Sequence, residues 1–274
     1  MPDLQSPRLQ KLDENTLTAE QRALAQSIAS GPRGQFKMSG PFAIYLHAPT
    51  FGELAQKLGG HLRFKTSVSP RLSEFAILCT AQHWKAQYEW AMHAPMAEKA
   101  GVKPVTIRDI HSGRAPKSAP SDEKALYAFV KELYAKRRVS TPTYNRAKKV
   151  LGETGVVELV GILGYYAMVS MTLNVFKAPL PEGVKPETIR AIQAGRPPKS
   201  AAKDEMMIYD FVKELYAKRR VSTPVYNRVK KLLGDAGTVE LVGILGYYAM
   251  VSMTLNVFKA PLPEGVKPAF AEPK

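Results

Sequence analysis

The chain has 274 residues, of which 45% are hydrophobic and 23% charged, and its formal net charge is +15 at pH 7. This composition favours a soluble globular protein with a sizeable core, and the single cysteine, Cys79, excludes an internal disulfide. The polar N-terminal run, residues 1–17, lacks the basic-then-apolar pattern of an export signal, so we expect a cytoplasmic location.

The first strongly patterned segment, residues 70–101, predicts one helix. Ser69 and Pro70 are typical of a helix start and Gly101 of a helix end. Apolar residues recur between them at helical spacing, on the side that also holds Cys79. We therefore expect a buried amphipathic helix in which Cys79 is an inert core thiol.

The same segment concentrates side chains suited to acid–base chemistry. Glu89 and His93 are four positions apart, so a helix places them on one face. A carboxylate beside an imidazole orients the ring and raises its proton affinity, as a general acid or base working near neutral pH requires. The alternative interpretation is a pair on a solvated helix face with no chemical role.

Metal binding is a further interpretation of this segment, since it also contains Glu74 and His83. His83 is ten residues before His93, which places it about 80° away around a helix. No HExxH pattern and no cluster of Cys and His accompanies these residues. We therefore expect no metal site.

Residues 102–183 align without a gap with residues 184–265, an offset of 184 − 102 = 82 positions. From residue 157 to residue 186 the two copies are identical at 30 positions, including residues that need not be buried, which indicates a recent tandem duplication. The unit is longer than solenoid repeats of about 20 to 50 residues.

Both copies have more basic than acidic residues, so much of the net charge is duplicated. No recognised nucleic-acid motif accompanies it, and we expect no specific nucleic-acid partner.

Gly and Pro punctuation divides each copy into four helical segments, which in the first copy are residues 105–111, 121–138, 142–151 and 153–176. Residues 159–176 are 18 uncharged residues, long enough to consider a membrane span. Polar residues along this run, among them Tyr165, Ser170 and Asn174, favour a core helix instead. We expect no membrane association.

Several short runs between residues 20 and 177 resemble the carboxymuconolactone decarboxylase family. They are Pro70-Arg71-Leu72-Ser73-Glu74, His83-Trp84, Gln87-Tyr88-Glu89-Trp90, His93, Ala100-Gly101-Val102, Gly164-Tyr165-Tyr166, Ser170-Met171-Thr172-Leu173-Asn174 and Phe176. The resemblance implies an all-α, alkylhydroperoxidase D-like helical bundle, here with an extra duplicated four-helix segment. It also implies assembly into homo-oligomers and an active site around Glu89 and His93.

The alkylhydroperoxidase D type carries Cys-x-x-Cys ahead of its histidine, whereas this chain has Ala86 and Glu89 at the matching positions. A thiol-dependent peroxidase is therefore a less favoured alternative, since Cys79 alone would need an external resolving thiol.

The resemblance implies decarboxylation of a small lactone carboxylic acid similar to 4-carboxymuconolactone, in which loss of CO2 leaves an enolate that must be protonated. We expect His93 to donate this proton and Glu89 to set its tautomer and charge, without a cofactor. The supporting polar residues are then Glu74 and His83. The substrate-binding residues are Arg71, which would hold the carboxylate, and the apolar walls Trp84, Tyr88 and Trp90.

We expect residues 1–183 to form the catalytic domain, with its central helix at about 70–100 and the first repeat copy at 102–183. The second copy, 184–265, lacks that helix, and residues 266–274 form a tail. The apolar helix of the second copy, residues 241–258, must be buried. It could replace a partner's helix, exchange into a neighbouring chain or pack on the first copy as a pseudo-symmetric pair. The opposite allocation, in which the second copy completes the site, stays open. A second hypothesis for function is a non-catalytic oligomer whose duplicated segment serves assembly.

Overall fold

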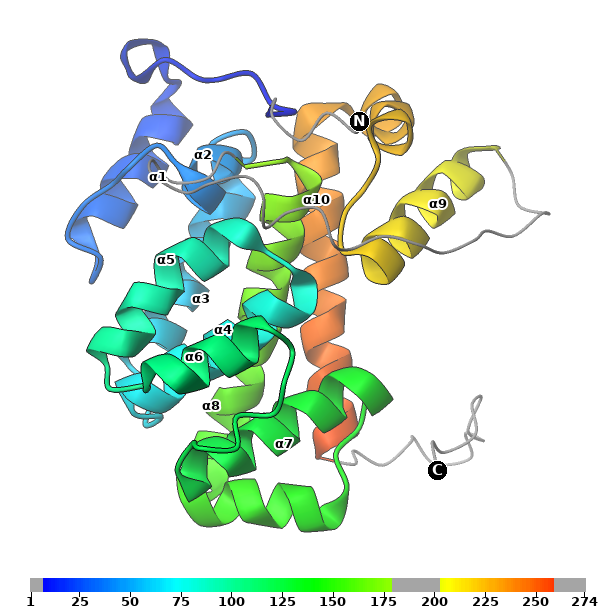
Figure 1. Cartoon of the computed structure of the whole chain (residues 1–274). Helices are drawn as coiled ribbons and strands as arrows, with labels where there is room; N and C mark the ends of the chain where they lie inside the picture. The colour runs from blue at the N-terminus through cyan, green and yellow to red at the C-terminus, as the bar shows by residue number, and fades with distance from the viewer. Residues whose placement is uncertain (1–6, 179–202, 259–274) are drawn as a thin grey trace, which may run out of the picture.

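The computed structural model describes residues 7–178 and 203–258. Across these ranges the chain forms helices and turns without a β-strand, which confirms the all-α prediction. After a short 3₁₀ turn, Glu14–Thr16, the helices in chain order are α1 (Ala19–Ser30), α2 (Gly40–Tyr45), α3 (Pro49–Phe64), α4 (Pro70–Trp84), α5 (Gln87–Lys99), α6 (Pro104–His111), α7 (Ser121–Lys136), α8 (Thr141–Val175), α9 (Lys203–Lys218) and α10 (Thr223–Val257) (Figure 1).

Helix α8 forms the centre of the core. Nearly all of its residues from Val156 to Val175 are buried. Contacts reach it from three sides: Leu62 of α3 packs on Gly161, Tyr134 of α7 donates a hydrogen bond of 3.1 Å to its backbone, and its own Asn174 donates one of 2.8 Å to the end of α4. The apolar run that could have suggested a membrane span is thus the core helix of this bundle.

The prediction of one helix over residues 70–101 is wrong, because the chain turns back between α4 and α5. Lys85 ends α4 in the left-handed conformation, with φ of 53°, and the amide of Ala86 bonds to the carbonyl of Ala81 at 2.9 Å. The two helices therefore form a hairpin. This turn decides which side chains meet in the site.

The helical segments predicted for the first repeat copy are confirmed as α6, α7 and the two halves of α8. Gly152, with φ of 72° and ψ of 179°, interrupts α8 where the sequence predicted a boundary, a conformation that glycine adopts without steric cost. In the second copy α9 and α10 match α7 and α8. The counterpart of α6 lies outside the described residues.

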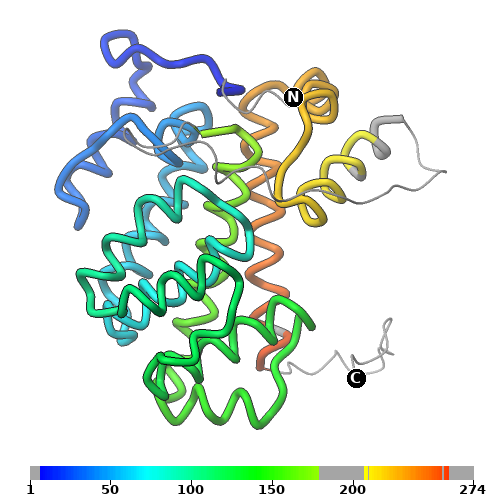
Figure 2. Tube along the Cα trace, in the orientation of Figure 1, coloured from blue at the N-terminus to red at the C-terminus, as the bar shows by residue number. Residues whose placement is uncertain are grey.

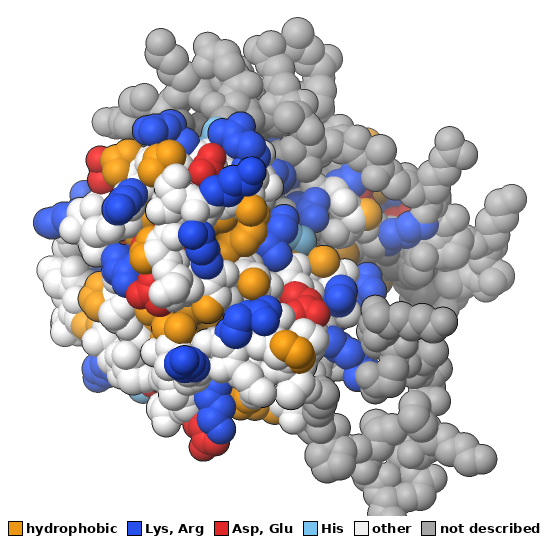
Figure 3. Space-filling model, turned by 60° about the horizontal axis from the view of Figure 1, so that its bottom comes forward, with side chains coloured by type: hydrophobic (Ala, Val, Ile, Leu, Met, Phe, Trp, Pro, Cys, Tyr) orange, Lys and Arg blue, Asp and Glu red, His pale blue; other side chains and the backbone are white. Residues whose placement is uncertain are grey.

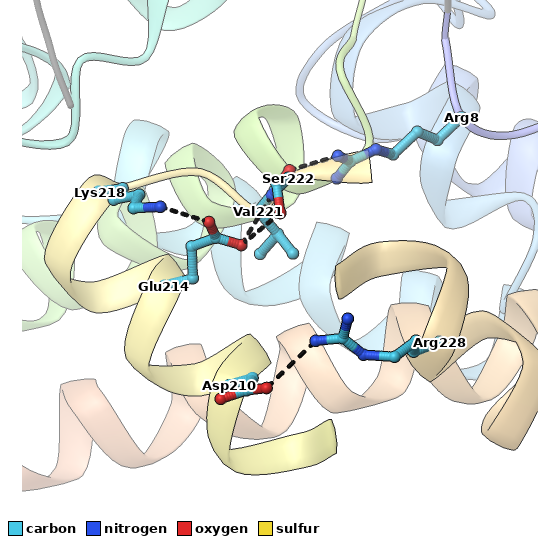
Figure 4. Close-up of polar contacts among 7 residues, drawn as sticks. All are labelled: Arg8, Asp210, Glu214, Lys218, Val221, Ser222 and Arg228. Carbon is cyan, nitrogen blue, oxygen red and sulfur yellow. Dashed lines mark hydrogen bonds and ion pairs between the residues drawn. The ribbon is translucent and has the colours of Figure 1, made fainter. Parts of the chain in front are cut away.

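The turn between α9 and α10 is held as the turn between α7 and α8 is. Glu214 accepts hydrogen bonds of 2.9 Å from both the amide and the hydroxyl of Ser222 and pairs with Lys218 (Figure 4). Glu132 likewise accepts a bond of 3.0 Å from Ser140. The duplicated sequence therefore folds locally in the same way twice.

The second copy is also tied to the rest of the molecule by the N-terminal segment. Arg8 donates hydrogen bonds to the carbonyls of Val175 in α8 and Val221 before α10, and its guanidinium lies 4.4 Å from the centre of the Tyr226 ring. Figure 4 shows this arginine reaching the α9–α10 turn, with the ion pair between Asp210 and Arg228 below it.

Helices α8 and α10 run antiparallel and side by side through the molecule (Figures 1 and 2). Their contacts are reciprocal, since Gly164 meets Met250 and Gly246 meets Met168, and Gly246 and Met250 lie 82 positions after Gly164 and Met168. This is the arrangement of two identical helices about a local twofold axis. Within one chain, the second copy thus packs on the first as a pseudo-symmetric pair.

By length and composition alone, α8 and α10 could each cross a membrane. The most apolar window of α8 is 83% buried inside the molecule, whereas that of α10 is 33% buried. Core helices of soluble proteins pass the same test.

Basic side chains on the lower face are spread out rather than gathered. Figure 3 shows Lys and Arg separated by apolar and acidic side chains across this face. A stripe of basic residues is the usual footprint of nucleic-acid binding, and this face does not present one.

Candidate functional site

His93 lies between two carboxylates in the interior. Its Nδ1 is 2.7 Å from Oε2 of Glu74, and its Nε2 is 3.3 Å from Oε2 of Glu89. All three side chains are buried, with exposed fractions of 4% for His93 and Glu89 and 9% for Glu74. We refer to these residues as the Glu74–His93–Glu89 cluster.

The α4–α5 hairpin assembles this cluster. Glu89 and His93 share a face of α5 because they are one turn apart, as predicted. Glu74 is 93 − 74 = 19 residues before His93, and on one continuous helix it would lie about 28 Å away. The turn at Lys85 brings α4 back against α5 and places the second carboxylate on the ring.

The two carboxylates keep His93 charged. Burial alone would lower the pKa of His93, but hydrogen bonds and charges from Glu74 and Glu89 outweigh it and raise the pKa to about 9. The imidazolium is therefore the dominant form at neutral pH. Arg63 of α3 adds a further positive charge, with Nη2 3.9 Å from Oε1 of Glu74.

Buried tyrosines line the cluster on the α8 side. The ring of Tyr166 meets that of His93 edge to face, with centroids 5.1 Å apart, and Tyr165 packs edge to face on Tyr166. Burial raises the pKa of Tyr166 well above its usual value, so its hydroxyl stays neutral and can donate a hydrogen bond.

Some buried polar atoms around the cluster have capacity for a further hydrogen bond. Among the described residues, Oγ of Ser170 has no hydrogen-bond partner within the protein, and Oε2 of Glu89 meets Nε2 of His93 at 3.3 Å. Ser170 is on the Tyr166 face of α8, one turn further on. Buried groups of this kind are costly unless a ligand or water satisfies them.

A second guanidinium approaches from the loop before α2. Arg33 lies over the ring of Phe42, 4.9 Å from its centre, and its Nε is without a hydrogen bond. Burial raises the pKa of Tyr165 to about 12 against the opposing charges of Arg33 and Arg63. The charges of both guanidinium groups therefore act on Tyr165, which packs on Tyr166.

His83 and Trp84 lie at the far end of α4, roughly 14 Å along the helix from Glu74. The His83 ring stacks on Tyr134, with centroids 4.4 Å apart. Burial, and to a smaller extent nearby cations, lower the pKa of His83 to about 3. Trp84 is buried and packs 5.9 Å from Tyr216 of α9. The structure does not bring either residue to His93.

Tyr88 and Trp90 are on α5 but face other neighbours. The Tyr88 hydroxyl is 3.4 Å from Oγ of Ser39. The Trp90 ring lies 4.8 Å from that of His111 and borders an open hollow of about 570 Å³ with Arg108 and Arg114. None of the three cluster residues borders this hollow.

Arg71, the predicted carboxylate-binding residue, is already paired within the protein. Its two terminal nitrogens lie 2.5 Å from carboxylate oxygens of Asp122 and Glu123 in α7. Glu123 is buried, so this pair joins α4 to α7. Arg63 is the arginine beside the cluster. No local pattern marks it, because only the fold brings α3 close to Glu74.

Cys79 is buried in α4, and burial raises the pKa of its thiol. The neutral thiol is a poor nucleophile, as expected from its apolar position. Within the described ranges, no group of three His, Cys, Asp or Glu side chains is arranged to hold a metal ion.

No protein-family model matches the chain, and no curated protein matches its sequence.

Proposed function

We propose that this protein is a carboxy-lyase that removes CO2 from a small lactone carboxylic acid, with His93 as the proton donor. The observation that carries this proposal is the buried His93 held charged between Glu74 and Glu89. The resemblance of residues 70–102 and 164–176 to the carboxymuconolactone decarboxylase family supports the reaction class.

In the proposed reaction the bond between the substrate carbon and its carboxylate breaks, and the electron pair enters the conjugated lactone as an enolate. The Nε2–H bond of His93 then breaks as a C–H bond forms, and the neutral ring takes a proton from solvent. Glu74 holds Nδ1 and fixes the ring, which leaves the Nε2 proton on the Glu89 side for transfer. The neutral Tyr166 hydroxyl is a candidate donor to the enolate oxygen.

The charges around His93 favour an acidic substrate once Arg33 is included. The negative charges of Glu74 and Glu89 balance the positive charges of His93 and Arg63, so Arg33 leaves the site with one excess positive charge. A guanidinium can hold a carboxylate through two parallel hydrogen bonds. In this proposal Arg33 takes the role first expected of Arg71.

The decisive experiment is CO2 release from 4-carboxymuconolactone by the purified chain. His93→Ala should lower turnover by about 10² to 10⁴ if His93 is the acid. Near-normal turnover by folded His93→Ala, or no turnover by the wild-type protein, would contradict the proposal.

The duplication provides a matched control for the tyrosine. Tyr166 and Tyr248 occupy the same position in identical sequence, but only Tyr166 contacts His93. Tyr166→Phe should lower turnover roughly tenfold, the cost of one hydrogen bond made in the transition state, whereas Tyr248→Phe should not change it. Equal effects would exclude a specific role for Tyr166.

The arginines are distinguished by KM. Arg33→Ala should raise KM for the carboxylate substrate, whereas Arg71→Ala should lower stability and leave KM unchanged. A raised KM in folded Arg71→Ala would return the substrate-binding role to Arg71.

A further inference from the structure

The same three side chains are buried in α8 and exposed in α10. Ile162, Tyr165 and Tyr166 have exposed fractions of 0%, 4% and 5%, whereas their duplicates Ile244, Tyr247 and Tyr248 have 53%, 53% and 63%. We call the stripe formed by Ile244, Tyr247, Tyr248 and the half-buried Val251 the α10 face. The α10 face thus has the same sequence as a surface of α8 that is almost completely buried.

The α10 face is separate from the surface that packs on α8. Its residues recur at spacings of three and four and so share one side of the helix. Gly246 and Met250, which meet α8, lie roughly 130° away around the helix axis, at 100° per residue. The face therefore remains available while the α8–α10 pair stays intact.

Among the described residues, none covers the α10 face as α3 and α5 cover the matching side of α8. In α8 this side is packed by α3, where Gly59 leaves room for Tyr165, and by α5, where His93 meets Tyr166. Glu158 also accepts bonds from the amide and hydroxyl of Ser67, while its duplicate Glu240 is exposed. The chain thus has two faces of identical sequence, one on α8 and one on α10. It has a single layer of helices α1 to α5, here called the α1–α5 layer, and this layer covers the face on α8.

We propose that the protein forms a twofold-symmetric dimer in which the α10 face packs against the α10 face of a second copy. Exchange of α1–α5 layers between two chains would uncover one face for each face that it covers, so it gains no burial. Each of two chains leaves one α10 face exposed. Packing these two faces against each other buries both of them.

The sequence of the α10 face suits such a contact. In an antiparallel pair centred between Tyr247 and Tyr248, each of these tyrosines meets the other tyrosine of the second copy, and Ile244 meets Val251. The pairing is the same in both directions, so it closes after two chains and does not continue into a filament. The α8–α10 pair already shows this helix sequence packed antiparallel on itself.

The first test is the mass of the full chain in solution by analytical ultracentrifugation without detergent. Two chains of 30.2 kDa should sediment together. Tyr248→Glu should give a single chain, because the dimer would bury two unpaired carboxylates. The matched control is Val157→Glu, since Val157 is 53% exposed on α8, away from this face, and this variant should remain a dimer. A monomeric wild-type protein, or a Tyr248→Glu variant that stays dimeric, overturns the proposal.

Cysteine crosslinking identifies the surface in contact. Tyr248→Cys should form a disulfide-linked dimer under mild oxidation, since position 248 lies beside the twofold axis, whereas Val157→Cys should not. A crosslink in the double variant His93→Cys/Tyr248→Cys, with none in Tyr248→Cys alone, would show that an α1–α5 layer covers the face and would overturn self-association. Binding of the wild-type protein to phosphatidylcholine vesicles in place of dimerisation would assign the face to a membrane and also overturn the proposal.

Discussion

The charge on His93 links the candidate site to the stability of the fold. Its pKa of about 9 in the folded protein exceeds the value near 6.5 of an unfolded histidine. A raised pKa stabilises the fold fully below the unfolded pKa, and this stabilisation is lost as the pH rises through the folded pKa.

We therefore expect the wild-type protein to lose on the order of 3 kcal/mol of unfolding free energy between pH 6.5 and 9.5 from this residue. Urea unfolding at several pH values would measure the loss. His93→Gln removes the titrating group and should show a correspondingly smaller loss over the same range, whatever its absolute stability. Equal pH dependence in the two proteins would mean that His93 does not carry the charge assigned to it.

The sequence could predict the contact between two of the three cluster residues. Glu89 and His93 meet through helical spacing, which is local. Glu74 was expected to be a supporting residue, but its contact with the ring depends on a turn at Lys85. Lysine seldom adopts positive φ, and no Gly, Pro or Asn marks the position. Arg63 and Tyr166 reach the site only through packing of distant segments, which no local pattern encodes.

At the scale of elements, proline and glycine residues at the helix boundaries made the helices of the repeat predictable. Pro142 in the first turn of α8 and Gly152 at its interruption are signals with direct steric causes. The pattern of α4 and α5 had no such signal between the two helices, and their continuous apolar spacing read as one helix. The sequence therefore predicts correctly that both segments are helical, but it does not predict the hairpin between α4 and α5.

The α8–α10 crossing depends on two glycines. A Cβ on Gly164 would lie 2.9 Å from Cα of Met250, and one on Gly246 would lie 2.9 Å from Cα of Met168. Backbone atoms cannot move aside as a flexible side chain can, so an alanine at either position must push the helices apart.

We expect Gly164→Ala and Gly246→Ala each to lower the free energy of unfolding by about 1 to 3 kcal/mol, despite the roughly 1 kcal/mol that alanine gains in a helix. Gly161→Ala is the control on the same helix, because its Cβ would meet only the end of the Leu62 side chain, at 3.0 Å, and it should be close to neutral. Chemical unfolding of the three variants would decide this. A neutral Gly164→Ala would show that the helices do not cross at these glycines.

At the scale of the molecule, identical sequence does not fix burial. Tyr165 and Tyr247 sit in the same 30-residue run, yet one is in the core and the other is 53% exposed. What differs is the presence of the α1–α5 layer. The sequence could reveal the duplication and the need to bury its apolar helix, but the choice among its possible placements depended on three-dimensional packing.

The reciprocal α8–α10 contacts suggest that α10 occupies the position that a second α8 would take. A chain ending at Gly183 would keep α8 and lose α10, exposing the surface around Gly164 and Met168. We expect this shortened chain to dimerise through α8, with Gly164 of each copy against Met168 of the other, and to sediment with twice its own mass. Gly164→Leu should prevent that association, because the longer side chain enters the space that Met168 fills. A soluble monomer, or aggregation without a defined dimer, would mean that α10 makes contacts that a second α8 cannot reproduce. A dimer would show that the duplication has placed within one chain an interface that two shorter chains can form.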